Sequence, residues 1–184
     1  MYVVDIETTG LNGLNEGDKI VEVGVSRISG TQVIPFYHAI VKHDDIMDYR
    51  DSWVFQNTDL TPEMVLNGVP EGEVINNLQK LLDGKIATSY NIEFDFIKFL
   101  NVYPYQVQPI IPFDIMDIAS RVIGKGEGWL KSEYCYSIAC PEDPAGLRFK
   151  QTHRALDDSI MEGHLLTHLL QIVGGNERDW RIKE

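Results

Sequence analysis

The sequence predicts a mixed α/β fold: a five-stranded sheet of three antiparallel strands followed by parallel strands, flanked by helices. Two patterns lead to this prediction. Residues 1–42 hold three apolar, partly alternating runs separated by short turns, which is typical of an antiparallel meander. From residue 61 onward, amphipathic helical patterns alternate with short apolar runs, which favours parallel strand pairing. The 184 residues have the length of one domain, 1–184.

Three strands are expected in the first part of the chain. The first lies in residues 1–11, the second covers 19–28 and the third covers 32–42. Polar, glycine-containing turns at 12–18 and 29–31 connect them, so neighbouring strands run in opposite directions. The first strand becomes central once further strands join the sheet.

Residues 43–60 are polar and irregular, and we expect a surface loop in which Trp53 and Phe55 tuck inward. His43 and the two aspartates after it could bind a metal, but a solvated charge cluster explains them better.

Capping residues, prolines and glycines delimit the remaining elements. In chain order, we expect a short helix that opens at Thr61 and ends at Gly68 and Pro70, a helix over 73–82, a strand over 85–90, a helix over 92–102 with Asn91 as its N-cap, a strand over 109–113, a helix from the Asp114 cap to Arg121, a short helix over 132–139 and a long helix over 155–173.

Two carboxylates interrupt the first apolar run. Asp5 and Glu7 are two residues apart, and this spacing points both side chains to the same face of a strand. Like charges on one face repel each other unless a cation lies between them, and Mg²⁺ or Mn²⁺ suits carboxylate ligands. Taken alone, the pair is better explained as the polar face of a solvated edge strand.

Two further carboxylates lie on apolar helix faces. Asp95 shares the face of Ile92 and Phe96, and Asp158 shares the face of Met161. A carboxylate is costly to bury in ionised form unless it is paired or bound to metal. His153, five residues before Asp158, can titrate near neutral pH.

If these groups converge, they suit metal-assisted phosphodiester hydrolysis with two divalent ions, Mg²⁺ or Mn²⁺, and a histidine general base.

Three motifs in this order resemble those of the DnaQ-like 3′-to-5′ exonucleases of the DEDDh type. They are Asp-Ile-Glu-Thr-Thr-Gly at 5–10, Asn-Ile-Glu-Phe-Asp at 91–95 and His-Arg-Ala-Leu-Asp-Asp at 153–158. The resemblance implies an RNase H-like fold and His153 as the general base. It implies the metal ligands Asp5, Glu7, Asp95 and Asp158. It also implies a 3′ terminal nucleotide bound by Thr8, Thr9, Gly10, Leu11 and Asn91.

The interval of five residues after the histidine selects Asp158 rather than Asp157 as the ligand, and the helix stripe selects the same residue. The chain departs from the family at two places that carry no metal chemistry. Tyr90-Asn91 replaces His-Asn, and residues 58–61 read Thr-Asp-Leu-Thr instead of His-Gly-Ile-Thr. These departures leave the choice between DNA and RNA open.

The net charge of −12 is unusual for a nucleic-acid-binding protein. Only residues 121–154 are net basic, with 6 Lys/Arg against 4 Asp/Glu. A polyanion backbone could lie along this stretch, and a solvated loop explains it about as well. The acidity favours short single-stranded 3′ ends, oligonucleotides or a polymerase or repair partner over tightly held duplex.

Cys135 and Cys140 complete no zinc set, so we expect reduced thiols. No apolar run approaches membrane-spanning length, so we expect a cytoplasmic protein without membrane insertion.

Two alternative functions remain at this point. One is a phosphodiesterase of oligonucleotides or dinucleotides that uses the same site. The other is a module that binds nucleic-acid ends without cutting them. Such a module would not need all four acids and the histidine of the three motifs.

Overall fold

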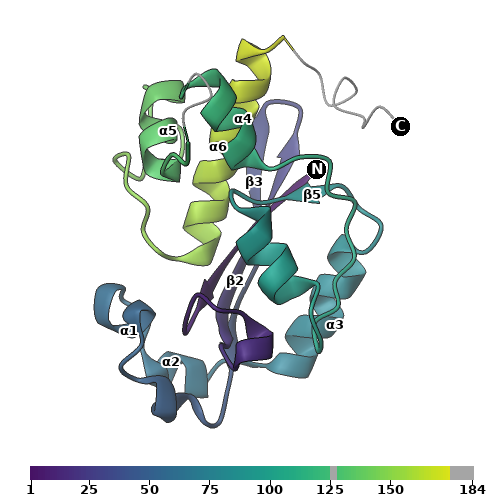
Figure 1. Ribbon diagram of the computed structural model, residues 1–184, viewed down its shortest axis with the longest axis vertical. Coiled ribbons are helices and arrows are strands. Elements are labelled where there is room, and N and C mark those ends of the chain that lie inside the picture. The colour runs from purple at the N-terminus through teal and green to yellow at the C-terminus, as the bar shows by residue number, and fades with distance from the viewer. Residues whose placement is uncertain (125–127, 175–184) are drawn as a thin grey trace.

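The computed structural model describes residues 1–124 and 128–174 (Figure 1). Its centre is a five-stranded sheet with the strand order β4-β3-β2-β1-β5. The strands are β1 (Tyr2–Thr8), β2 (Ile20–Ser29), β3 (Gln32–Lys42), β4 (Val69–Pro70) and β5 (Ala87–Thr88). β1, β2 and β3 pair antiparallel, whereas β5 is parallel to β1 and β4 is parallel to β3. This mixed sheet confirms the predicted fold class.

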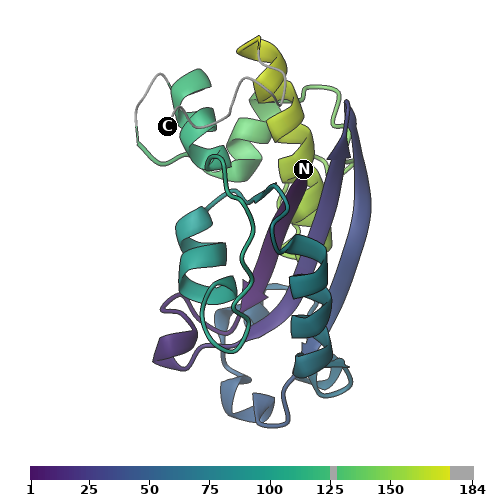
Figure 2. The same cartoon turned by 90° about the vertical axis from the view of Figure 1, so that its right-hand side faces the viewer.

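Helices cover both faces of the sheet (Figures 1 and 2). They are α1 (Trp53–Asn57), α2 (Pro62–Leu66), α3 (Glu71–Leu82), α4 (Ile115–Val122), α5 (Ser132–Ala139), α6 (Ala155–Ile172), the 3₁₀ helices η1 (Leu14–Glu16) and η2 (Ile46–Tyr49), and the π-helix η3 (Glu93–Leu100). Among the residues described, no helix combines the length and the apolar character that crossing a bilayer requires.

Side-chain alternation along β1 divides the core. Val4 and Ile6 pack with α3 and η3 on one face, around residues such as Phe96. Val3 packs on the other face with α4, α5 and α6, around residues such as Leu165. Because Asp5 and Glu7 follow Val3 with a period of two, they lie on the α6 face of β1.

One of the five strands lies in a different segment from the predicted one. Residues 109–113 make only an isolated parallel bridge between Ile110 and Ile86. Pro109 and Pro112 explain this difference, because proline has no N–H to donate to a ladder. β4 completes the sheet instead, in a segment that the sequence analysis assigned to a helix end.

Two other predicted segments differ in detail. The loop over 43–60 contains η2 and α1, and the helix predicted over 92–102 is a π-helix at Glu93–Leu100. In η3, Asn101 N donates to Phe96 O, the five-residue step of a π-helix. π-Turns are frequent at functional sites.

β2 and α6 approach each other closely at Gly24. A Cβ atom added to Gly24 would lie 2.1 Å from the carbonyl carbon and oxygen of Ala155, so only glycine fits. Two residues along β2, Ser26 Oγ donates to Ser159 O at 2.7 Å. These contacts hold the first turn of α6, and therefore Asp158, against the middle of the sheet.

Candidate active site

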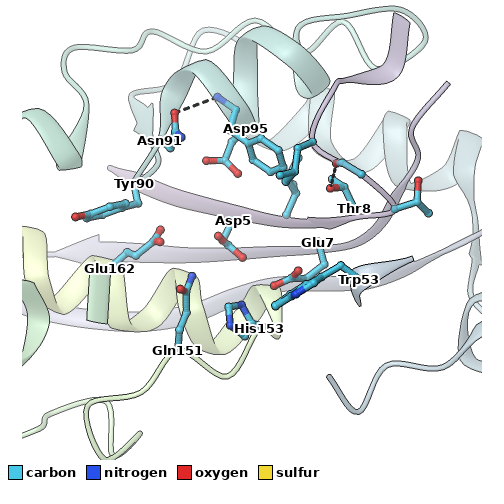
Figure 3. Close-up of a pocket in the computed structure, with 15 residues that line it drawn as sticks. Asp5, Glu7, Thr8, Trp53, Tyr90, Asn91, Asp95, Gln151, His153 and Glu162 are labelled. Carbon is cyan, nitrogen blue, oxygen red and sulfur yellow. Dashed lines mark hydrogen bonds between the residues drawn. The ribbon is translucent and has the colours of Figure 1, made fainter. Parts of the chain in front are cut away.

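A cavity of about 460 Å³ lies beside the carboxyl end of β1, between η3 and the segment that leads into α6 (Figure 3). Its walls include four of the five predicted catalytic residues, Asp5, Glu7, Asp95 and His153. They also include the predicted substrate-binding residues Thr8, Thr9, Gly10, Leu11 and Asn91. Asp158 lies behind this surface and is fully buried. The fold therefore brings the three sequence motifs to one place.

Asp5 occupies the middle of the site. Its Oδ2 atom is buried and, among the described residues, has no hydrogen-bond partner. Burial raises the pKa of Asp5 well above its usual range, and the nearby carboxylates of Glu162 and Asp95 raise it further. Burial is also the main cause that raises the pKa of Glu7, to about 8. An unpartnered carboxylate oxygen among other acids is what a cation site requires, so this donor set fits divalent metal ions.

Asp95 reaches the cavity from the first turn of η3. It is 3% exposed, and burial raises its pKa to about 7. Its backbone N–H donates to Asn91 O at 2.9 Å. The side chain of Asn91 also accepts from Phe94 N, the dashed contact of Figure 3, and thereby caps this turn as expected. Asn91 thus orients the turn that carries Asp95.

Asp158 organises the segment that carries the histidine. Its two carboxylate oxygens accept hydrogen bonds from Thr152 N and His153 N, each at 2.9 Å. Burial raises the pKa of Asp158 to about 7, although these hydrogen bonds oppose the shift. One ligand atom each of Glu7, His153 and Asp158 lie within 4.8 Å of one another. Of the two neighbouring aspartates, Asp158 rather than Asp157 therefore belongs to this cluster.

His153 has the left-handed backbone conformation, with φ of 54°. Its imidazole packs edge-on against the ring of Trp53, with centroids 4.9 Å apart and planes at 85°. Burial lowers the pKa of His153, which favours the neutral imidazole that a general base requires.

The expectation that Trp53 tucks inward is wrong. Its side chain is 56% exposed and forms a wall of the cavity over His153 (Figure 3). The apolar side chain of Trp53 suggested burial. It packs instead against His153, which lies 100 positions later in the sequence and cannot be found from the local pattern.

Arg154, the residue after His153, fixes this segment to the rest of the protein through ion pairs. Arg154 Nη2 and Nε donate to the carboxylate of Glu22 at 2.7 to 3.1 Å, and Nη1 donates to Asp59 Oδ1 at 3.1 Å. Glu22 is fully buried and also lies 2.6 Å from His38 Nε2. Although burial acts to raise the pKa of Glu22, its hydrogen bonds to His38 and Arg154 lower it overall. The guanidinium of Arg154 is therefore already paired with protein carboxylates and is not available to bind a phosphate. Lys125, in the same basic stretch, lies outside the described residues.

The turn after β1 is held by its own polar groups. Thr8 Oγ1 donates to Gly10 O, and Thr9 Oγ1 accepts from Lys19 N. A Cβ atom at Gly10 would lie 2.2 Å from the Asp18 carboxylate, which explains the glycine. Leu11 is left 72% exposed at the rim of the cavity.

The acidic cluster at residues 43–45 is organised differently. His43 is buried, and its Nε2 contacts Ile20 O at 2.8 Å. Asp44 pairs with Lys42, and Asp45 pairs with Lys19. Each member has a protein partner, and His43 is buried rather than part of the solvated cluster that the sequence analysis expected.

Among the cavity residues that the sequence analysis did not select are two polar side chains, Gln151 and Glu162, and the aromatic residues Trp53, Tyr90 and Phe94. Glu162 lies one turn after Asp158 on the apolar face of α6. The argument that selected Asp158 would have selected it too.

The buried acids predict an unusual pH dependence of stability. Without metal, Glu7, Asp95 and Asp158 have folded-state pKa values of about 7 to 8, above their usual values. Between about pH 5 and pH 8, the folded state therefore holds protons that the unfolded state has released, so the unfolding free energy falls as pH rises. In EDTA we expect the melting temperature to be lower at pH 8 than at pH 5.5, by about 5 °C or more.

Melting curves at the two pH values, with and without Mg²⁺, measure this effect. Mg²⁺ should remove most of the difference, and Asp95→Asn should reduce it in EDTA. A melting temperature in EDTA that rises with pH would contradict the prediction.

Sequence comparisons identify relatives of the chain. A family model described as Exonuclease, named RNase T, matches residues 2–166. The PolC-type DNA polymerase III of Thermotoga maritima is 28% identical over 171 residues, covering 93% of this chain and 12% of that protein. The 3′-5′ exonuclease DinG of Bacillus subtilis is 27% identical over 172 residues, covering 92% of this chain and 17% of that protein. The chain thus spans less than a fifth of either relative.

Solved structures share the fold. Exonuclease X in complex with 5′ overhanging duplex DNA has a TM-score of 0.66 and 21% identity, covering 96% of this chain and 95% of that chain. E. coli Exonuclease I in complex with a dA16 oligonucleotide has a TM-score of 0.62 and 16% identity, covering 97% of this chain and 41% of that chain. Because the family model covers most of the sequence, the chain belongs to the DnaQ-like exonuclease family of hydrolases, which has the RNase H-like fold.

Proposed function

We propose that this chain is one metal-dependent exonuclease domain that removes nucleoside 5′-monophosphates from the 3′ end of single-stranded DNA or RNA. The observation that carries the proposal is the convergence of Asp5, Glu7, Asp95, Asp158 and His153 around one cavity, with an unpartnered buried oxygen on Asp5. Family membership supports the hydrolytic chemistry, and the DNA in the titles of both structural neighbours supports a nucleic-acid substrate.

In this proposal, Asp5, Glu7, Asp95 and Asp158 hold two divalent ions, Mg²⁺ or Mn²⁺. Bound ions of this kind lower the pKa of an attacking water and balance the charge that develops on the leaving oxygen. His153 accepts the proton of that water at a ring nitrogen, because partial burial lowers its pKa and so favours the neutral imidazole. Asp158 positions this histidine through its hydrogen bond to His153 N.

The remaining cavity residues bind and orient the substrate. Thr8, Thr9, Gly10 and Leu11 form one wall for the terminal nucleotide, and Asn91 lines the cavity beside Tyr90 and Asp95 (Figure 3). Trp53 forms the wall on the other side of Glu7 (Figure 3). A polymerase or repair protein is the partner that we propose, on the basis of the similarity to the PolC-type polymerase.

The test uses single strands of DNA and RNA, each labelled internally and blocked at either the 5′ or the 3′ end. With Mg²⁺ or Mn²⁺, we expect stepwise shortening and mononucleotide release unless the 3′ end is blocked. Asp5→Asn is the inactive control. No release with either metal and either nucleic acid would overturn the proposal.

A second candidate is a phosphodiesterase of dinucleotides, favoured by the cavity volume of about 460 Å³, which suits one small ligand. The net charge of −12 also disfavours long polyanions. Turnover of a dinucleotide and of a longer strand, each at several concentrations, separates the two functions. A kcat/KM for the dinucleotide that is at least about tenfold higher, a difference of about 1.4 kcal/mol, would favour the second.

Trp53 provides a test of the cavity wall. We expect Trp53→Ala to lower kcat/KM by about tenfold, because the substrate loses an apolar wall and His153 loses its aromatic neighbour. Trp129→Ala is the matched control, because Trp129 is 79% exposed and does not line the cavity. Equal kinetics for the two variants would contradict a role for Trp53 in the site.

A further inference from the structure

Glu162 is a fifth carboxylate at the site that no sequence motif includes. It lies on α6, one turn after Asp158, and is 1% exposed to solvent. It nevertheless lines the cavity together with Asp5 and Asp95. Figure 3 shows its side chain reaching toward Asp5 from beside Tyr90, on the side of Asp5 opposite Glu7.

The surroundings of Glu162 offer it little compensation. Its Oε2 atom is buried and has no hydrogen-bond partner among the described residues. The charged groups that act on it most strongly are Asp95, Asp158 and Asp114, and all three repel a carboxylate. The described residues that line the cavity include no lysine or arginine. A hydrogen bond from the backbone of Tyr90 acts in the opposite direction and partly compensates this repulsion.

Burying such a group without a partner is costly. A leucine or methionine at this position would continue the apolar face of α6 formed by Met161 and Leu165. Asp5 Oδ2 and Glu162 Oε2 are both buried and unpartnered in the same cavity. A cation held near both oxygens would satisfy both of them.

We propose that Glu162 is a fifth acidic ligand of the metal centre, on the side formed by Asp5 and Asp95. This inference rests on the proposed metal-dependent function. It extends the ligand set from four carboxylates to five, so that two divalent ions leave the centre with one net negative charge. With Glu162 included, the metal centre binds the ions more tightly than the four motif acids would alone.

The test is titration of metal-free protein with Mn²⁺ by calorimetry. Glu162→Gln keeps the size of the side chain and removes its charge. We expect the affinity for Mn²⁺ to fall about tenfold or more. Glu63→Gln is the matched control, because Glu63 is exposed on α2, and we expect unchanged affinity. An affinity of Glu162→Gln within about twofold of wild type would overturn the inference.

Thermal unfolding gives a readout that is independent of turnover. At pH 8 in EDTA, we expect Glu162→Gln to melt at a higher temperature than wild type, because the variant no longer buries a carboxyl group among other acids. The stabilisation on adding Mn²⁺ should be smaller than for wild type. A purely structural role predicts the reverse, a lower melting temperature in EDTA and an unchanged gain with Mn²⁺.

Two further variants keep the outcomes separate. Glu162→Met has a similar length and no charge, and it replaces the glutamine variant if that variant fails to fold, with the same expected and overturning results. Asp5→Asn tests the metal centre itself. If Asp5→Asn weakens Mn²⁺ binding but the Glu162 variants do not, only this inference fails. If none of them weakens it, the proposed metal-dependent function fails too.

Discussion

Replacing His153 by alanine should lower kcat by about a hundredfold to ten-thousandfold while leaving Mn²⁺ binding largely intact. In the proposed mechanism the imidazole accepts the proton, whereas the carboxylates provide the negative charge that holds the ions. Asp158→Ala should lower both kcat and Mn²⁺ affinity. It removes a ligand, and it also leaves Thr152 N and His153 N without their acceptor.

Single-turnover kinetics and calorimetry with Mn²⁺ on the same preparations test this division of roles. Asp157→Ala is the matched control, because this neighbour lies outside the cluster of Glu7, His153 and Asp158, and its activity should stay close to wild type. Equal losses of Mn²⁺ affinity in the His153 and Asp158 variants would show that the two side chains do not have separate roles.

The second large effect is expected at Gly24, which touches no substrate in the proposed site. Gly24→Ala should lower the unfolding free energy by about 3 kcal/mol, because its Cβ would overlap the backbone of Ala155 and neither backbone is free to move. Activity should fall as well, since displacing the first turn of α6 displaces Asp158 and the histidine segment that it holds.

Denaturant unfolding of the variant measures the stability loss. Gly72→Ala is the control. Gly72 lies in α3 with nothing within 4 Å of an added Cβ, and alanine favours a helix, so this variant should be as stable as wild type or more stable. A Gly24→Ala protein of wild-type stability would mean that β2 and α6 are not packed in the way described here.

The parts of the site that the sequence predicts are those set by local periodicity. A period of two places Asp5 and Glu7 on one face of β1, and a helical period places Asp95 and Asp158 on buried faces. The same periodicity marks Glu162, one turn from Asp158. No motif contains Glu162, because the family resemblance supplies only four acids, and its place on the stripe is the one signal in the sequence that marks it.

The parts that the sequence does not predict depend on register and on long-range contacts. Glu22 lies opposite Glu7 in the antiparallel pairing of β1 and β2, a relation that only the register reveals. Its partner Arg154 is 132 positions away. Trp53 and His153, whose rings are in contact, are also far apart in the sequence, by 100 positions. The short edge strand β4 is not predicted either, because its two residues are too few to show an alternating apolar and polar pattern.

The ion pair between Arg154 and Glu22 has a consequence for how ligands cooperate. The guanidinium next to the histidine is already neutralised, and the described residues of the cavity wall carry no other arginine and no lysine. In the proposed function, most of the positive charge that an incoming phosphate meets inside the cavity then comes from the bound ions. If the proposed function holds, nucleic acid and divalent ions are thermodynamically linked, and each raises the affinity for the other by the same factor. The proposed domain would then bind a polyanionic substrate more tightly when it has bound metal.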